Sequence, residues 1–207
     1  MTSPPPPGPP QNLWTAAVGR NPGHAEGYAQ RWRRLEAAGQ DIHGEARLID
    51  AMAPRGARIL DAGCGSGRLG GYLARAGHEV VGVELDPHLI AVARADHPQV
   101  RWEVQNLAGL GLRDADGTRL LFDLQVSAGN VLTFLAGAER RPALSRLADH
   151  LAPAGRLVVG FGLGRGYAAA DFEADAAAAG LRIQQRFGGW DLRPADEEFL
   201  LAVLVRT

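Results

Sequence analysis

The stretch that decides the fold is "ILDAGCGSGRLGGYLARAGHEVVGVELDPHLI", residues 59–90. A short apolar run leads into a loop with glycine at 63, 65 and 67, and "RLGGYLARAG" then carries apolar residues at helical spacing. Gly77 suits a left-handed helix end, and "HEVVGVEL" is typical of a second strand. The stretch therefore predicts a strand, a tight loop, a helix and another strand.

The same alternation continues toward the carboxyl end. "VRWEVQN" and "LLFDLQVSAGN" are typical of third and fourth strands, and a helix over about residues 137–151 precedes a fifth, "GRLVVGFG". "LRIQQRFGGWDL" and "EEFLLAVLVRT" are separated by the short "RPADE", which favours antiparallel pairing of the last two strands. The sequence thus predicts a single α/β domain with helices on both faces of a mainly parallel sheet.

The segment before the sheet differs in composition. Residues 1–11 include "SPPPPGPP", a proline-rich tail that we expect to be disordered. "GHAEGYAQRWRRLEAAGQ" and "DIHGEARLIDAMAP" predict two helices within residues 12–54, outside the repeating unit. The ligand-binding domain is expected over residues 55–207.

Composition narrows the class of protein. The chain has 207 residues, 46% hydrophobic content and a net charge of -1, which fits one domain with a full core. Scattered basic residues and the lack of a long apolar run predict no nucleic-acid partner, no membrane span and no secretory signal. Cys64 is the only cysteine, so we expect a cytoplasmic protein without a disulfide or a bound metal.

Two features of residues 59–90 predict a bound nucleoside. A glycine loop between a strand and a helix lies where open α/β sheets bind ligands, and small residues let a ligand touch the main chain. Glu84 follows Gly63 by 21 residues, at the end of the next strand. An acid at about that distance accepts hydrogen bonds from ribose hydroxyls.

Asp61 distinguishes between two nucleoside cofactors. The spacing Gly65-x-Gly67-x-x-Gly70 also matches the dinucleotide fingerprint of NAD-binding proteins. An ionised Asp61 at the strand end would repel a pyrophosphate but attract the ammonium of the methionine end of S-adenosylmethionine. The acid therefore favours S-adenosylmethionine over NAD.

Residues 59–90 closely resemble the first two motifs of the class I S-adenosylmethionine-dependent methyltransferases, and the resemblance extends from about residue 40 to the end. "YAQRW", "HGEARLIDAMAPRGARILDAGCG" and "VSAGNVL" are similar to small, mostly uncharacterised actinobacterial methyltransferases. The resemblance implies a Rossmann-like, seven-stranded sheet in the order 3-2-1-4-5-7-6 with strand 7 reversed. It also implies that the helices of residues 12–54 form a lid over the cofactor.

The resemblance further implies a position for each part of the cofactor. The residues carried over are Asp61, Gly63, Cys64 and Gly65 at the methionine, Glu84 at the ribose, Leu85 at the adenine face, Asn106 and Leu107 at the adenine edge, and Ser127 and Ala128 under the sulfonium. The family's usual residue at position 106 is aspartate. Asn106 keeps an acceptor for the adenine amino group but lacks the charge.

No single catalytic residue is implied by the family, and three candidates arise from their positions. Tyr28 stands four residues before Trp32, so both project from one helix face toward the expected acceptor pocket, or pack that helix on the sheet. His43 is the histidine that we would test first as a base, although it also suits a helix cap. Asn130, after the fourth strand, would orient an acceptor or cap the helix that follows.

These observations predict an S-adenosylmethionine-dependent methyltransferase that acts on an oxygen, nitrogen or carbon nucleophile of a small molecule, as a monomer or homodimer. Two alternatives stay open. One is an NAD(P)-dependent oxidoreductase, which would bind a nicotinamide cofactor. The other is a non-catalytic S-adenosylmethionine-binding protein, which would bind the cofactor without turnover.

Overall fold

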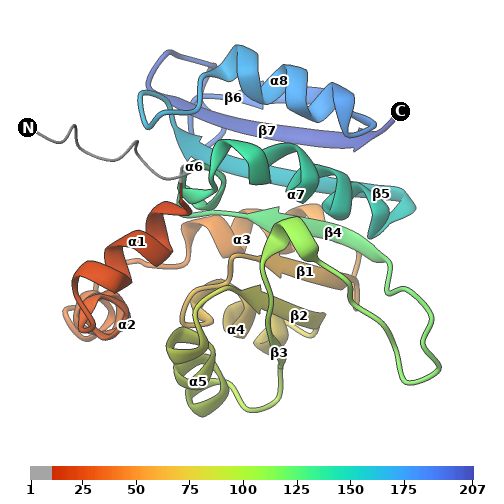
Figure 1. Cartoon of the computed structure of the whole chain (residues 1–207). Helices are drawn as coiled ribbons and strands as arrows, with labels where there is room; N and C mark the ends of the chain where they lie inside the picture. Colours follow the sequence, from red (N-terminus) through yellow and green to blue (C-terminus); the bar gives the residue numbers. More distant parts are fainter. Residues whose placement is uncertain (1–10) are drawn as a thin grey trace, which may run out of the picture.

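The fold is built on one seven-stranded sheet, which the computed structural model describes within residues 11–207 (Figure 1). The strands are β1 (Arg58–Ala62), β2 (Glu79–Glu84), β3 (Arg101–Val104), β4 (Phe122–Ser127), β5 (Leu151–Gly162), β6 (Leu181–Phe187) and β7 (Phe199–Arg206). Their order is β3-β2-β1-β4-β5-β7-β6. Strands β1 to β5 pair in parallel, whereas β7 is antiparallel to both β5 and β6. The predicted order and the reversed seventh strand are confirmed.

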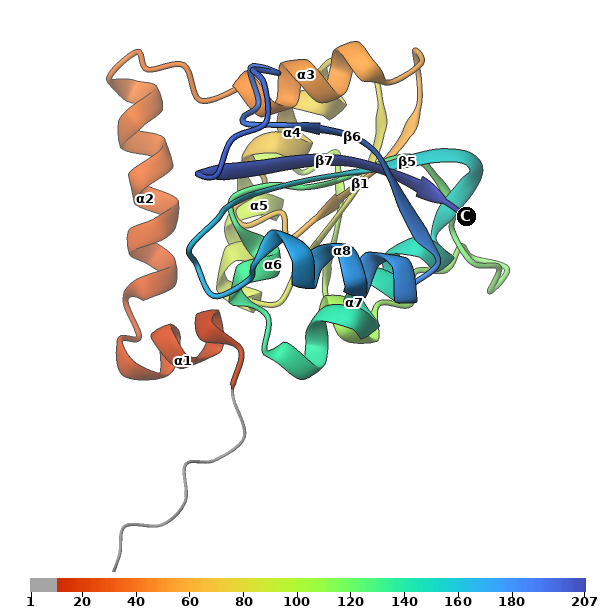
Figure 2. The same cartoon turned by 90° about the horizontal axis from the view of Figure 1, so that it is seen from above.

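Helices cover both faces of the sheet (Figure 2). One face packs against α3 (Gly44–Met52), α4 (Arg68–Arg75) and α5 (Pro87–Asp96), and the other against the 3-10 turn η1 (Leu107–Gly109), α6 (Val131–Phe134), α7 (Gly137–Asp149) and α8 (Ala169–Ala178). Successive strand residues point to opposite faces of the sheet: Ile59 packs with the residues of α3, α4 and α5, and Leu60 with those of η1, α6, α7 and α8. Asp86 caps α5, accepting from the His88 amide at 2.8 Å.

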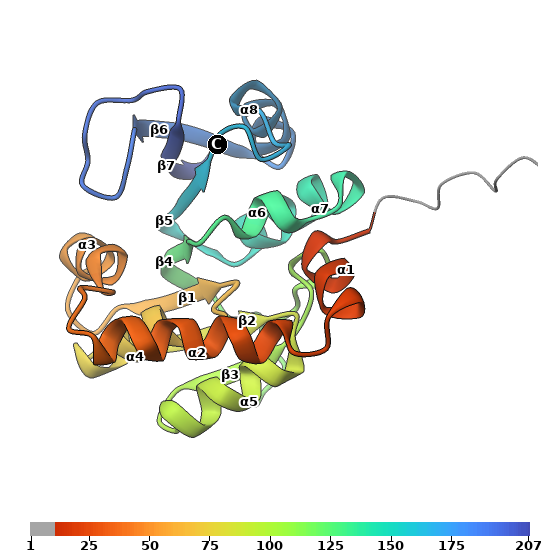
Figure 3. The same cartoon turned by 90° about the vertical axis from the view of Figure 1, so that its left-hand side faces the viewer.

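Two helices precede this repeating unit. They are α1 (Leu13–Arg20) and α2 (His24–Ala37), and α2 crosses the edge of the sheet at which the parallel strands end (Figures 2 and 3). The two helices predicted before the sheet correspond to α2 and α3, whereas α1 and α8 are additional. No helix among residues 11–207 has the length and apolar character needed to cross a bilayer. The tail predicted at 1–11 lies outside the described residues except for Gln11.

Candidate active site

The glycine loop, residues 63–67, carries the chain from β1 into α4. Gly63, Gly65 and Gly67 have φ values of 85°, 54° and 85°, in the left-handed region that glycine adopts without a steric penalty. A Cβ at Gly63 would lie 2.5 Å from Cγ1 of Val131, and one at Gly65 would lie 3.2 Å from the Tyr28 hydroxyl. The sequence predicts that these glycines leave room for a ligand. In the structure, the space that their Cβ atoms would occupy is already taken by side chains of the protein itself.

Glu84 ends β2 with its carboxylate bound to the glycine loop. Its Oε2 accepts from the Gly65 amide at 3.1 Å, while its Oε1 accepts from the amides of Leu85 at 2.7 Å and Asp86 at 3.1 Å. Burial raises the pKa of Glu84, and the three N–H groups oppose that rise by stabilising the ionised form. The carboxylate is therefore fixed in place, and an ionised carboxylate has acceptor capacity for about one further donor.

Asp61 lies deeper, inside β1. It is only 2% exposed, and its Oδ2 accepts from the Gly70 amide at 2.9 Å. Burial raises the pKa of Asp61 to about 7, so the carboxylate predicted to be ionised is divided between its two protonation states near neutral pH. Asp61 also borders a small cavity of about 20 Å³, together with Tyr28 and Gly63, which has room for one water molecule.

A cleft of about 770 Å³ opens at the carboxyl ends of the strands. Such a volume lies within the usual range for small-molecule and cofactor sites. The expected cofactor residues that line it are Gly63, Gly65, Glu84, Leu85, Asn106, Leu107 and Ala128. Asp61 and Cys64 line only the small cavity beside the cleft, and Ser127 lines neither space.

Two of the three catalytic candidates reach the cleft. Tyr28 and Asn130 both line it. Burial raises the pKa of Tyr28, which keeps its hydroxyl protonated and able to donate. Asn130 does not cap α6 with its side chain; its Oδ1 instead accepts from the Gly162 amide at 2.8 Å. This bond leaves the Asn130 amide nitrogen as its free donor.

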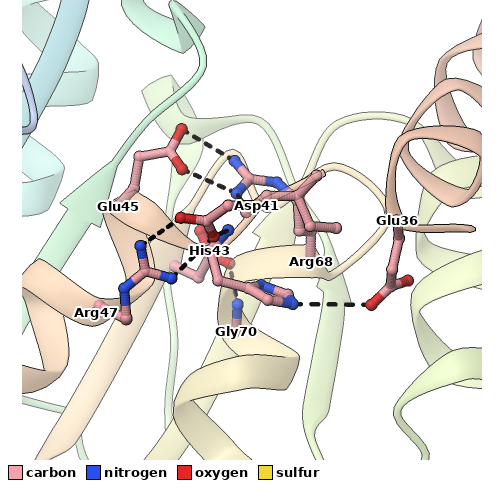
Figure 4. A network of polar contacts seen from close by, with 9 residues as sticks. Glu36, Asp41, His43, Glu45, Arg47, Arg68 and Gly70 are labelled. Atoms are coloured by element: carbon pink, nitrogen blue, oxygen red, sulfur yellow. Dashed lines mark hydrogen bonds and ion pairs between the residues drawn. The ribbon is translucent and has the colours of Figure 1, made fainter. Parts of the chain in front are cut away.

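His43 lies outside both the cleft and the small cavity. Its ring packs on Tyr72, with centroids 5.1 Å apart, and its Nε2 lies 3.7 Å from Oε1 of Glu36 (Figure 4). Burial lowers the pKa of His43. The residue stands at the N-cap of α3 without a side-chain capping bond, so the structure does not bring it to the expected reaction centre.

Arg68, directly after the glycine loop, joins the loop to the amino-terminal helices. Its guanidinium forms two bonds to the Glu45 carboxylate, of 2.9 and 3.1 Å, and also donates to the carbonyl of Ile42 (Figure 4). The same group lies 4.2 Å from the ring centroid of Trp32. Arg68 thereby fixes the position of α2 and α3 relative to the glycine loop.

Comparison with known proteins identifies the family. The crystal structure of a TehB-like SAM-dependent methyltransferase from Corynebacterium glutamicum ATCC 13032 Kitasato is 53% identical, covers 90% of this chain and 100% of its own, and superposes with a TM-score of 0.85. The chain belongs to the class I S-adenosylmethionine-dependent methyltransferases. A family model described as "Methyltransferase domain" matches residues 59–155 of this chain. The family's cofactor is S-adenosylmethionine, which is therefore favoured over NAD as the cofactor of this chain.

Curated relatives match this chain over shorter stretches. Ubiquinone biosynthesis O-methyltransferase of Xanthomonas axonopodis pv. citri is 33% identical over 96 residues, which is 42% of this chain and 40% of the relative. Malonyl-[acyl-carrier protein] O-methyltransferase of Pectobacterium atrosepticum is 31% identical over 105 residues, 51% of this chain and 40% of the relative. The aligned part thus spans about 40% of the length of these relatives.

The methyltransferase site also contains residues that the sequence did not single out. Trp14 of α1 lines the cleft, donates from Nε1 to Oδ2 of Asp86 at 2.8 Å and packs edge-on against Tyr28. Asn12 could have indicated the start of α1 from the sequence, because asparagine is favoured at the N-cap. In the structure its Oδ1 accepts from the Trp14 amide at 3.0 Å. Arg20, Arg31 and Arg165 line the cleft as well.

Proposed function

We propose that this chain transfers a methyl group from S-adenosylmethionine to an oxygen, nitrogen or carbon nucleophile of a small molecule. The observation that carries the proposal is the bond between the Glu84 carboxylate and the Gly65 amide, which joins the expected ribose acceptor to the glycine loop in one cleft. The cleft extends beyond Glu84 and Gly65 to Asn130, which follows β4, and to Trp190, which lies between β6 and β7. It therefore offers room for an acceptor beside the cofactor.

The residues present fit S-adenosylmethionine part by part. Glu84 would accept from a ribose hydroxyl, Leu85 and Leu107 would pack on the adenine, and the glycine loop would run along the methionine. Nε1 of Trp32 is a buried polar atom without a hydrogen-bond partner among the described residues. Trp32 lines both the cleft and the small cavity, so its indole N–H is available to an acceptor atom of a bound ligand.

A nearby carboxylate compensates for the charge missing at position 106. Nδ2 of Asn106 donates to Oε1 of Glu139 at 2.7 Å, while its Oδ1 accepts from the Ala108 amide at 2.9 Å. Oε2 of Glu139 accepts from Nδ2 of Asn12 at 3.3 Å. Because a carbonyl oxygen has two lone pairs, Asn106 can still accept from the adenine amino group, with the Glu139 charge behind it.

When bound, S-adenosylmethionine supplies a methyl group that is already activated by the positively charged sulfur. The chain's own part is to position the reactants and exclude water. Helices α1 and α2 serve as a lid, because Trp14, Tyr28 and Trp32 line the cleft from that side. Among residues 11–207, His24 is the one histidine that lines the cleft, so it replaces His43 as the candidate base for a protonated acceptor.

The remaining expectations are part of the same proposal. Cys64 is buried and free, which fits a reducing cytoplasm and a packing role beside the cofactor. A cleft of this size favours a small-molecule acceptor over a nucleic acid or a membrane surface. Sedimentation of the purified protein with and without cofactor product will tell monomer from homodimer.

Glu84→Gln tests the assignment. We expect calorimetric titration with S-adenosylhomocysteine to show binding weaker by about 1 to 3 kcal/mol, because one charged acceptor of the ribose hydroxyls is lost. Glu79→Gln is the matched control, since Glu79 begins the same strand and is exposed. It should leave the affinity unchanged.

Three outcomes would contradict the proposal. Equal affinity of both folded variants would remove Glu84 from the site. Tight binding of NAD(P) with none of S-adenosylhomocysteine would restore the oxidoreductase alternative. A protein that binds the cofactor but releases no S-adenosylhomocysteine with any fraction of a cell extract would be a binding protein instead.

A further inference from the structure

Nearly every arginine of the described chain has a protein partner. All 22 basic residues of the sequence are arginine. Among residues 11–207, all but four of their side chains form an ion pair or a hydrogen bond with a protein oxygen or ring nitrogen. The exceptions are Arg20, Arg31, Arg165 and Arg182. Three of these four, all except Arg182, line the cleft.

The charges that line the cleft do not cancel. Its two carboxylates are already engaged: Glu45 pairs with Arg68, and Glu84 accepts three backbone amides and is expected to bind the ribose. Arg20 and Arg165 have no partner among the described residues, and Arg31 contacts only the Trp32 ring, 5.6 Å from its centroid, so none of the three guanidinium groups at the cleft is paired with an anion of the described chain. A planar guanidinium forms paired hydrogen bonds with carboxylate and phosphate groups, which makes it the typical binder of both.

Arg165 lies on the acceptor side of the cleft. It follows β5, which is separated from β1 and its glycine loop by β4, and strands are spaced about 4.8 Å apart. A Cβ at Gly162 would lie 3.1 Å from Nε of Arg165 and 3.6 Å from Oδ1 of Asn130. Arg165 and Asn130 thus converge on one point at the end of β5, away from the expected position of the cofactor's methionine.

We propose that the methyl acceptor carries a carboxylate or phosphate group, which Arg165 binds while Arg20 and Arg31 add positive charge to the same cleft. This inference rests on the proposed function, because it assigns the substrate class of the same cleft. Trp190 and Phe199 line the cleft near Arg165 and provide apolar surface for the body of the acceptor. The anionic group anchors the acceptor while its nucleophile faces the methyl group.

The test uses matched anionic and neutral probes on the full chain saturated with S-adenosylhomocysteine. Benzoate is compared with benzamide, and phenyl phosphate with phenol, by calorimetry at low ionic strength. We expect each anion to bind at least tenfold more tightly than its neutral partner. The tighter of the two anions tells whether the site suits a carboxylate or a phosphate.

Arg165→Gln should remove most of this preference. Arg182→Gln is the matched control, because Arg182 is equally partnerless but lies on β6, outside the cleft. It should retain the full preference. Equal binding of anions and neutral probes by the wild type, no binding of any anion, or equal behaviour of the two variants would overturn the inference.

The same titrations separate this inference from the proposed function. S-adenosylhomocysteine is titrated first, and the probes are then added to the protein with and without it. Failure to bind S-adenosylhomocysteine contradicts the cofactor assignment. Normal binding of S-adenosylhomocysteine without a preference for anions contradicts the acceptor class alone.

Discussion

Asp61→Asn should make the unliganded protein more stable at pH 8 while weakening its binding of S-adenosylmethionine. Burial raises the pKa of Asp61 to about 7, from an ordinary value of 3.8, so the folded protein at pH 8 holds an ionised group that is better solvated in the unfolded chain. Each pKa unit corresponds to 1.36 kcal/mol, which gives an expected gain of about 2 to 4 kcal/mol for the neutral side chain. Asparagine keeps an oxygen for the Gly70 amide.

The sign of the effect fixes its pH range. An acid whose pKa is raised by folding contributes most to stability below its unfolded pKa, and that contribution is lost as the pH rises through the folded value. The stability gap between Asp61→Asn and the wild type is therefore full above pH 7, shrinks as the pH falls, and disappears near pH 4. Thermal unfolding measured from pH 4 to pH 8 checks this course.

The affinity of Asp61→Asn for S-adenosylmethionine should fall, whereas its stability should rise. We expect ionised Asp61 to hold the ammonium of the methionine end through a water in the small cavity, so wild-type affinity should rise by up to tenfold per unit between pH 5.5 and pH 7. Asp61→Asn should bind at least tenfold more weakly at pH 7.5 and lose this pH dependence. Asp116→Asn, in an exposed loop, is the control and should alter neither property. A variant at position 61 that is less stable and binds normally would contradict both expectations.

The predicted part of the fold followed from local signals that agree with each other. Gly77, expected to end a helix in the left-handed conformation, has a φ of 95° and follows α4. The short polar segment between β6 and β7 left no length for a crossover helix, so the reversed strand followed from connection length. Each of these signals depends on residues close together in the sequence.

The missed part of the site depends on contacts between distant segments. Trp14 reaches the cleft because it bonds to Asp86, 72 residues away. His43 precedes α3 on the approach to β1, but packing of its ring on Tyr72 keeps it away from the cleft. Spacing along the chain shows that a histidine is near a helix start, whereas its direction is set by tertiary packing.

The glycine loop shows the same limit at a single residue. The pattern predicts a tight glycine loop, and the structure gives Gly63 a φ of 85°, in the left-handed region. Sequence alone could not show that Val131, 68 residues later, packs where a Cβ would stand. Two separate demands therefore act at Gly63: the backbone conformation and the space taken by Val131.

Gly63→Ala should lower the free energy of unfolding by about 2 to 5 kcal/mol. Part of this loss is the strain of a left-handed alanine, and the rest is overlap with Val131, whose Cγ1 would lie 2.5 Å from the new methyl group. The displaced loop should also bind S-adenosylhomocysteine at least tenfold more weakly. Gly117→Ala is the matched control, because Gly117 has a φ of 81° and open space around it. It should lose only the strain, about 1 kcal/mol.

Val131→Ala separates the two demands. In the Gly63→Ala/Val131→Ala double variant the overlap is gone but the strain persists. The combined loss should therefore be smaller than the sum of the single losses by about 1 to 3 kcal/mol, as urea unfolding of all four proteins will measure. The double variant should also regain cofactor affinity relative to Gly63→Ala. Additive losses would mean that the loop shifts away from Val131 freely, and Gly63 would then be required by its backbone conformation alone.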